Sequence, residues 1–166
     1  MSESNEEIMP GVMAMGGFGP LPLEAFHDMT GLEILRAIIS GDLPAPPISK
    51  TLSLALVEAD EGRVVFKGLP KVDYLNPGGS VHGGWTATIM DSALACVVHS
   101  VLKKGEALAT TEFKLNLLRP VREGVLRAEA EIISMSRRMA VVRIDITNGD
   151  RLAGAAQGTV SIQDPR

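Results

Sequence analysis

One segment of this sequence has no proline or glycine and is apolar on almost every side. It starts after Gly83-Gly84 and continues to about Leu102, where Lys103-Lys104-Gly105 follows. A helix that is apolar all round is a buried helix, so we expect this segment to form the central helix of the fold. It contains one acid, Asp91. A buried carboxylate is costly unless another group pairs with it or a reaction uses it.

The segment before this helix, Asn76-Pro77-Gly78-Gly79-Ser80-Val81-His82, is rich in turn-forming residues. Asn-Pro and Gly-Gly are typical of loops. A helix that begins at Gly83 or Gly84 presents unpaired N–H groups and the positive end of its dipole. Such an end can stabilise a developing oxyanion.

The separation between this helix start and Asp91 limits how the two can cooperate. Seven or eight residues correspond to roughly 10.5–12 Å along a helix axis. Both groups therefore cannot reach one reacting carbon within a single chain. If both are catalytic, the amide comes from one copy and the acid from another, and a two-fold axis creates two such sites. On that condition the spacing predicts a homodimer.

The N-terminal part of the chain is expected to be peripheral. Residues 1–22 are rich in Gly, Met and Pro, and we interpret them as a flexible tail. Residues 23–47 contain a capping-box pattern, Thr30-Gly31-Leu32-Glu33, and apolar residues at helical spacing up to Gly41. They predict a short N-terminal helix followed by the proline-rich connector Pro44–Pro47.

The rest of the chain, residues 48–166, reads as strands on both sides of the long helix. Alternating apolar residues and turn signals, including Asn148-Gly149, predict these strands. They span about 52–56, 63–69, 107–118, 124–134, 139–147 and 151–162. An antiparallel sheet cannot bury its face alone, so we expect an α+β fold in which the sheet is wrapped around the central helix.

Composition excludes several classes of protein. A chain of 166 residues is expected to form one domain, and its net charge of -4 argues against a nucleic-acid partner. No apolar run reaches membrane-spanning length, and the acidic N-terminus is no signal peptide. The single cysteine, Cys96, suits a reducing cytosol, and we expect a cytoplasmic protein. We interpret Cys96 as a core residue. The one cysteine and three histidines lack metal-ligand spacing, so we expect no metal site.

The pattern Asn-Pro, then His-Gly-Gly, then an acid nine positions after the histidine, resembles the phenylacetic-acid-degradation (PaaI-like) branch of the hotdog-fold acyl-CoA thioesterases. The resemblance covers roughly Leu52 to Ile162. It implies a hotdog fold over residues 48–166 and hydrolysis of an acyl-CoA to a carboxylic acid and coenzyme A. Coenzyme A would then be part of the substrate and a product, with no bound cofactor. A homodimer or a homotetramer is the expected assembly.

The resemblance also implies roles for individual residues. Asp91 matches the acid that acts as general base on water or as nucleophile on the thioester carbonyl; both mechanisms remain open. Gly83 matches the residue whose amide polarises the thioester oxygen. Asn76 matches a residue that orients the thioester or the water, although Asn before Pro also initiates turns unaided. His82 is expected to shape the loop, and Gly84 reads as a turn glycine.

Weaker candidates lie outside this motif. Thr110 falls where the family often has a hydroxyl that touches the water or the acid, although ordinary β-branched strand content is the preferred explanation. Arg119, Arg122, Arg137 and Arg138, with Lys103-Lys104, could bind coenzyme A phosphates. Of these, the turn at Arg137-Arg138 is the first choice, and solvated turn charge is the alternative.

Two other functions fit the same fold. A hotdog protein could bind acyl-CoA without turnover, as a sensor or carrier, but it would not need Asp91. A hotdog enoyl-CoA hydratase would be expected to place a catalytic His-acid pair on one pocket wall, and the Gly-Gly after His82 fits a thioesterase better.

Overall fold

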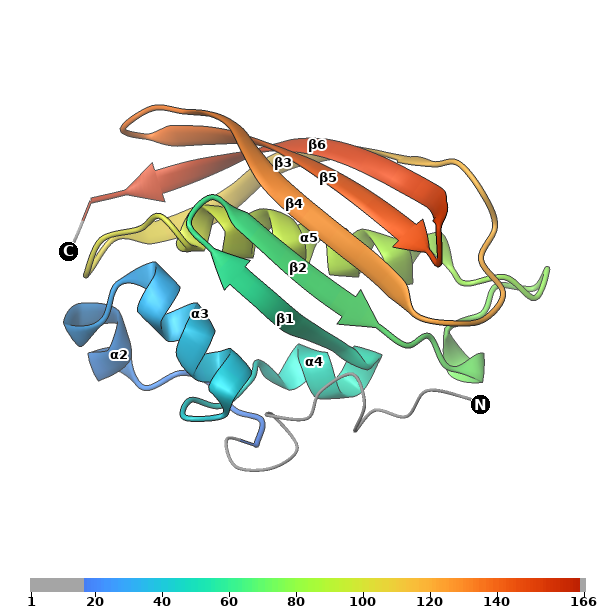
Figure 1. Cartoon of the computed structure of the whole chain (residues 1–166), viewed down its shortest axis with the longest axis horizontal. Coiled ribbons are helices and arrows are strands. Elements are labelled where there is room, and N and C mark those ends of the chain that lie inside the picture. The colour runs from blue at the N-terminus through green and yellow to red at the C-terminus, as the bar shows by residue number, and fades with distance from the viewer. Residues whose placement is uncertain (1–16, 165–166) are drawn as a thin grey trace.

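Three short helices lead into a six-stranded sheet and one long helix in the computed structural model, which describes residues 17–164 (Figure 1). The expected tail therefore lies largely outside the described residues. The helices and strands are α2 (Leu23–Asp28), α3 (Gly31–Ser40), α4 (Pro47–Leu52), β1 (Leu54–Asp60), β2 (Arg63–Gly68), the 3-10 turn η2 (Val72–Tyr74), α5 (Gly83–His99), β3 (Ala107–Leu117), β4 (Leu126–Met135), β5 (Met139–Asn148) and β6 (Arg151–Gln163).

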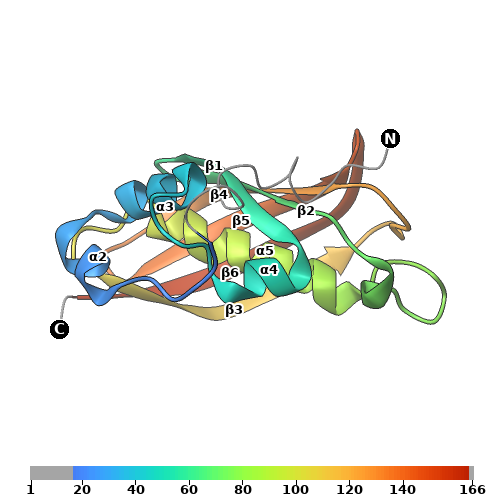
Figure 2. The ribbon, with the colours of Figure 1, turned by 90° about the horizontal axis from the view of Figure 1, so that it is seen from below.

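The sheet is antiparallel throughout, in the order β1-β2-β4-β5-β6-β3. The crossover from β2 through α5 and β3 places β4 beside β2, so β1 and β3 become the two edges of the sheet. Figures 1 and 2 show the sheet curving around α5, with β1 and β3 on either side of the helix. This arrangement confirms the predicted hotdog-type α+β fold.

The core lies between the concave face of the sheet and α5. The α5 side chains of Ile89, Met90, Ala93, Leu94 and Val97 are fully buried. They meet fully buried residues on the inner face of the sheet, among them Val64, Ala128, Ala130, Val142, Ile144 and Val160. Gly158 on β6 allows this close approach, because a Cβ there would lie 2.3 Å from Cδ1 of Leu94.

One face of α5 is left partly open, which corrects the expectation that the helix is buried on every side. Ala87, Thr88, Asp91, Ser92 and Ala95 are only half-buried and recur at helical spacing. The sheet covers the other faces, and its two edges stop short of this one. We call these five residues the open strip of α5.

The predicted N-terminal helix is α3. Its capping box is present: Thr30 N donates to Glu33 Oε2 at 2.7 Å, and Glu33 N donates to Thr30 Oγ1 at 3.4 Å. Gly41 ends the helix in the left-handed conformation, with φ of 86°. Gly31 lets α3 approach the end of α5, since a Cβ there would lie 1.7 Å from the carbonyl oxygen of His99.

Two further short helices were not predicted. Helix α2 lies before α3, and Pro47 is the first residue of α4 rather than the end of a connector. Proline is favoured at that position because its missing N–H would have no partner there. The first strand consequently starts at Leu54, two residues later than predicted. Within the expected tail, Gly19 N donates to Ala45 O at 3.0 Å, which joins residues 17–22 to this region. No helix in the described part of the chain is long and apolar enough to cross a membrane.

Candidate active site

Asn76 organises the loop that leads into α5. Its Oδ1 accepts hydrogen bonds from Gly78 N at 2.9 Å and Ser80 N at 3.3 Å. Its Nδ2 donates to Ser80 Oγ at 2.9 Å, and its own amide donates to Ser80 O at 2.8 Å. Its carbonyl oxygen also accepts from Gly79 N at 2.9 Å, so both the side chain and the backbone of Asn76 hold the turn together. One Nδ2 hydrogen is still free to meet a ligand.

His82 is the N-cap of α5. Its Nδ1 accepts from Gly84 N at 2.9 Å, and its backbone N donates to Tyr74 O at 2.8 Å. The carbonyl oxygen of His82 accepts from Trp85 N at 3.0 Å. These contacts match the loop-shaping role expected for His82, and they occupy the amides of Gly84 and Trp85.

The amide of Gly83 differs from its neighbours. Across residues 17–164 it donates no hydrogen bond to the protein, although it is the first amide of a helix of 17 residues. It therefore combines a free N–H with the positive end of the helix dipole. An oxygen that gains negative charge is the natural partner for such a group.

A cavity of about 250 Å³ opens beside this amide. Gly83, Asn76 and Ser80 line it from the loop, and Leu117 and Arg119 line it from the end of β3. A Cβ at position 83 would lie 2.8 Å from Cδ1 of Leu117, so glycine leaves room for an approaching group. Sequence reasoning did not identify Leu117. It lies on an exposed edge strand, where no pattern in the sequence marks a residue that lines a cavity.

Asp91 lies on the open strip, and Thr110 on β3 contacts it. Thr110 Oγ1 donates to Asp91 Oδ1 at 3.1 Å, and both residues are half-buried. The register of β3 against β6 shifts between Thr110 and Glu112. Such bulges re-aim side chains and are common next to active sites. The structure thus brings Thr110 to Asp91, one of the two partners that the family resemblance allowed for it.

Asp91 and Gly83 do not meet within one chain. They are the ninth and first residues of α5, about 12 Å apart along its axis. The cavity beside Gly83 is lined by neither Asp91 nor Thr110. A single protomer therefore holds two separate halves of the expected site.

Cys96 and His99 occupy the second half of α5. Desolvation by the surrounding side chains, and then the negative charge of Asp91, raise the pKa of the Cys96 thiol to about 12. The thiol is therefore neutral near pH 7, which agrees with a packing role and not with a nucleophile. Burial lowers the pKa of His99. Within residues 17–164, no group of three or more His, Cys, Asp or Glu side chains could hold a metal ion.

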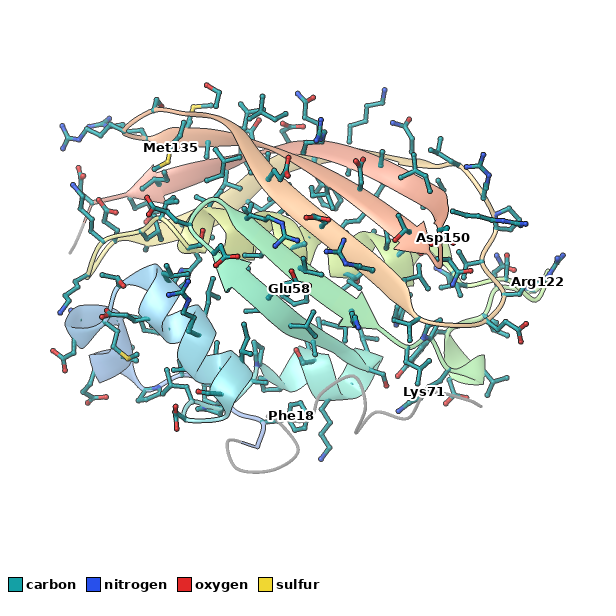
Figure 3. The ribbon with its side chains drawn as sticks, viewed as in Figure 1. Phe18, Glu58, Lys71, Arg122, Met135 and Asp150 are labelled. Carbon is teal, nitrogen blue, oxygen red and sulfur yellow. The ribbon has the colours of Figure 1, made fainter. Side chains whose placement is uncertain are left out.

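Arg137 and Arg138 form the tip between β4 and β5, next to Met135. Figure 3 shows Met135 at one end of the sheet and Arg122, near the loop that precedes α5, at the other. Arg137 pairs with Asp164 at 3.0 Å, and its side chain is 77% exposed. The two arginines therefore lie far from Gly83 of the same chain, and neither lines its cavity.

Comparisons with known proteins agree with this fold and motif. Residues 78–155 match the model of the Thioesterase superfamily. A Saccharolobus solfataricus protein named "Putative esterase" is 35% identical over 83 residues, which are 49% of this chain and 55% of that protein. The chain thus aligns with about half the length of the first curated relatives it matches.

Solved structures extend the likeness over most of the fold. The phenylacetic acid degradation-related protein of Ralstonia eutropha is 26% identical with a TM-score of 0.72, covering 76% of this chain and 98% of that one. A point variant of the phenylacetic acid degradation protein PaaI of Thermus thermophilus is 26% identical with a TM-score of 0.64, covering 69% and 97%.

The sheet wrapped around α5, with the His-Gly-Gly start of that helix, defines a hotdog-fold domain. Residues 78–155 of this domain match the Thioesterase superfamily, and the predicted resemblance to the PaaI-like hotdog thioesterases is confirmed.

Proposed function

We propose that this protein hydrolyses an acyl-CoA thioester to a carboxylic acid and coenzyme A, at two sites shared between the subunits of a homodimer. One observation carries the proposal: α5 presents an unpaired Gly83 amide at its first position and a Thr110-bound Asp91 eight positions later. The two groups suit one reaction, and the helix holds them too far apart to serve it alone.

The open strip supports the dimer. Gly83 and Asp91 are each four residues from Ala87, which lies on the strip. If two α5 helices pack antiparallel with Ala87 at the two-fold axis, Gly83 of each copy comes opposite Asp91 of the other. Strand β3 is a sheet edge beside the strip, and an unpaired edge can pair with its symmetry mate across the same axis.

In the general-base form of the mechanism, Asp91 accepts a proton from a water molecule while the water oxygen attacks the thioester carbonyl carbon. The carbonyl oxygen gains negative charge, and the Gly83 amide of the other subunit donates to it. The tetrahedral intermediate then collapses, the carbon–sulfur bond breaks, and the thiolate takes the proton back from Asp91. The products are the free acid and coenzyme A.

In the nucleophilic form, an Asp91 oxygen attacks the carbonyl carbon and expels the thiolate, which leaves an anhydride that water hydrolyses. Turnover in water enriched in oxygen-18, followed by mass spectrometry of the peptide that contains Asp91, detects the nucleophilic form in which water attacks the Asp91 carbonyl carbon of the anhydride. Label in the carboxylate supports the covalent route.

Other residues support these steps in the proposal. His82 and Gly84 hold the helix start in place, and the remaining Nδ2 hydrogen of Asn76 orients the thioester or the water. Coenzyme A is substrate portion and product, and no cofactor takes part. Arg137 and Arg138 remain proposed contacts for its phosphates; in an antiparallel dimer, they would approach the partner's half of the site.

The test is thiol release from a panel of acyl-CoA esters by the wild type and by Asp91→Asn. The proposal expects a loss of about 10²-fold or more in kcat for Asp91→Asn. Asp145→Asn is the matched control, because Asp145 is also half-buried but lies on β5 outside the site. Equal thiol release by the wild type and Asp91→Asn would remove Asp91 from the mechanism. Tight binding of acyl-CoA with no release by the wild type would favour a sensor or carrier.

A further inference from the structure

A second cavity, of about 130 Å³, lies between the N-terminal helices and α5. Leu35 and Ile38 of α3 and Ile48 of α4 form its outer wall, and Ala55 of β1 lies beside them. Ser92, Ala95 and Cys96 of α5 form the opposite wall. Figure 1 shows α3 and α4 on the same side of β1.

The cavity begins next to the proposed catalytic acid. Ser92 directly follows Asp91, and Ala95 lies four residues after it, on the same face of the helix. Both belong to the open strip, so a group held at Asp91 has a short path into the cavity. The influence of the Asp91 charge on the Cys96 thiol agrees with this proximity.

The chemistry of the lining selects for an apolar occupant. Its walls are aliphatic apart from Phe66, Cys96 and the two hydroxyls of Ser49 and Ser92, and no charged side chain lines it. The Ser92 hydroxyl already donates to Thr88 O at 2.9 Å. A charged or strongly polar group placed there would lose its hydration without a partner.

The volume of the cavity sets a limit on the size of this occupant. An apolar cavity of roughly 150 Å³ holds one benzene molecule and stays dry without it. A cavity of about 130 Å³ therefore suits a group close to a single six-membered ring. A long straight chain would meet the side chains of α3 and α4.

We propose that this cavity receives the acyl group, so that the enzyme prefers a compact apolar acyl chain of about six to eight carbons, with α3 and α4 setting the limit. This inference rests on the proposed thioesterase function. It assigns a specificity role to the N-terminal helices, and above all to Ile48, which is 45% exposed and can be replaced with little risk to the core.

The experiment measures kcat/KM for acetyl-CoA, hexanoyl-CoA, phenylacetyl-CoA, octanoyl-CoA and palmitoyl-CoA. The wild type is expected to have a kcat/KM for hexanoyl-CoA or phenylacetyl-CoA that exceeds the values for acetyl-CoA and palmitoyl-CoA by about tenfold or more. The reason is that one methylene in a fitted pocket changes the ratio of kcat/KM between two substrates by roughly 10–200-fold. Comparing hexanoyl-CoA with phenylacetyl-CoA separates a short chain from a ring. The variant Ile48→Trp should lower the preference for both over acetyl-CoA by about tenfold. The variant Ile48→Ala should raise kcat/KM for octanoyl-CoA relative to kcat/KM for hexanoyl-CoA.

Ile133→Trp and Ile133→Ala are the matched controls, because Ile133 is 55% exposed on β4 and does not line the cavity. Both should keep the wild-type preference. Unchanged preferences in the two Ile48 variants, or palmitoyl-CoA as the best wild-type substrate, would overturn the inference and leave the proposed function standing. Absence of hydrolysis with all five esters would instead overturn the proposed function. If Ile48→Trp does not fold, Ile48→Ala alone decides, because it only removes atoms from an exposed side chain.

Discussion

The hydroxyl of Thr110, on an edge strand of the sheet, donates a hydrogen bond of 3.1 Å to Oδ1 of Asp91, on the open strip of the central helix. The contact lies beside a bulge in β3, which sets the direction of the Thr110 side chain. One carboxylate oxygen is thereby fixed and the other, Oδ2, remains available for a water molecule or a carbonyl carbon. Edge strand and helix together orient the proposed catalytic acid.

Removing this hydroxyl should slow the reaction without abolishing it. In Thr110→Val the shape of the side chain is kept and the hydrogen bond is lost, so Asp91 is no longer held in one orientation. We expect kcat to fall by about tenfold, with Thr110→Ser close to the wild type. Steady-state kinetics with one acyl-CoA tests both variants. Equal rates for Thr110→Val and the wild type would show that the contact has no part in positioning.

The Gly83 amide can be deleted with little change to the helix. Gly83 is the first residue of α5, where proline is favoured, and His82 before it has φ of -62° and ψ of 135°, which suits a residue that precedes proline. Gly83→Pro removes the N–H, whereas Gly83→Ala keeps it and adds a comparable Cβ. We expect Gly83→Pro to lose about 10²–10³-fold in kcat beyond the loss in Gly83→Ala. Similar losses in the two variants would point to crowding at Leu117 and not to the amide.

Mixed dimers test whether the site is shared between subunits. Asp91→Asn and Gly83→Pro homodimers should each be nearly inactive. A mixed dimer would have one site with both defects and one intact site, so equal mixing with free exchange should restore about a quarter of the wild-type activity. Activity is measured after subunit exchange, and native mass spectrometry confirms the mixed species. Mixed dimers that stay inactive would contradict a shared site.

We predict that replacing Ser53 by glycine stabilises the folded protein. Its φ of 52° is left-handed, its side chain is fully buried, and its hydroxyl is the buried side-chain group that has no hydrogen-bond partner within residues 17–164. Ser53→Gly should raise the free energy of unfolding by about 1 kcal/mol, because glycine adopts this conformation without a steric cost. Ser53→Ala keeps the strained backbone and should gain less. Thermal or urea unfolding decides, and a glycine variant below the wild type would contradict the assignment of strain.

His99 should make the fold sensitive to mild acid. Burial lowers its pKa in the folded protein below the ordinary value of about 6.5. The unfolded chain therefore binds the proton first, so stability is full above about pH 6.5 and falls as the pH drops toward the lowered folded value. His99→Gln should flatten this slope between about pH 7 and pH 5.5. His27→Gln, at an exposed histidine of α2, is the matched substitution for comparison, and urea unfolding across this range measures the slopes.

The central elements of this protein follow from local patterns of residues. The apolar segment that starts at Trp85 specified the long helix, which ends at His99 and not near Leu102 as predicted. Period-two alternation specified the strands, and Thr30 with Glu33 specified the start of α3. The motif from Asn76 to Asp91 identified the family. These features are local: each depends on residues close together in the chain, whose conformational preferences do not need a partner.

Which polar groups are free and which are hydrogen-bonded depends on the packing of the whole chain. No local pattern shows that His82 takes the Gly84 amide and leaves the Gly83 amide unpaired, or whether the Thr110 hydroxyl contacts Asp91 or only belongs to the strand. The open strip and the cavity behind Ile48 likewise depend on where the sheet edges and the N-terminal helices stop. Burial and hydrogen bonding between segments far apart in the chain are set by packing, and packing is a property of the whole fold.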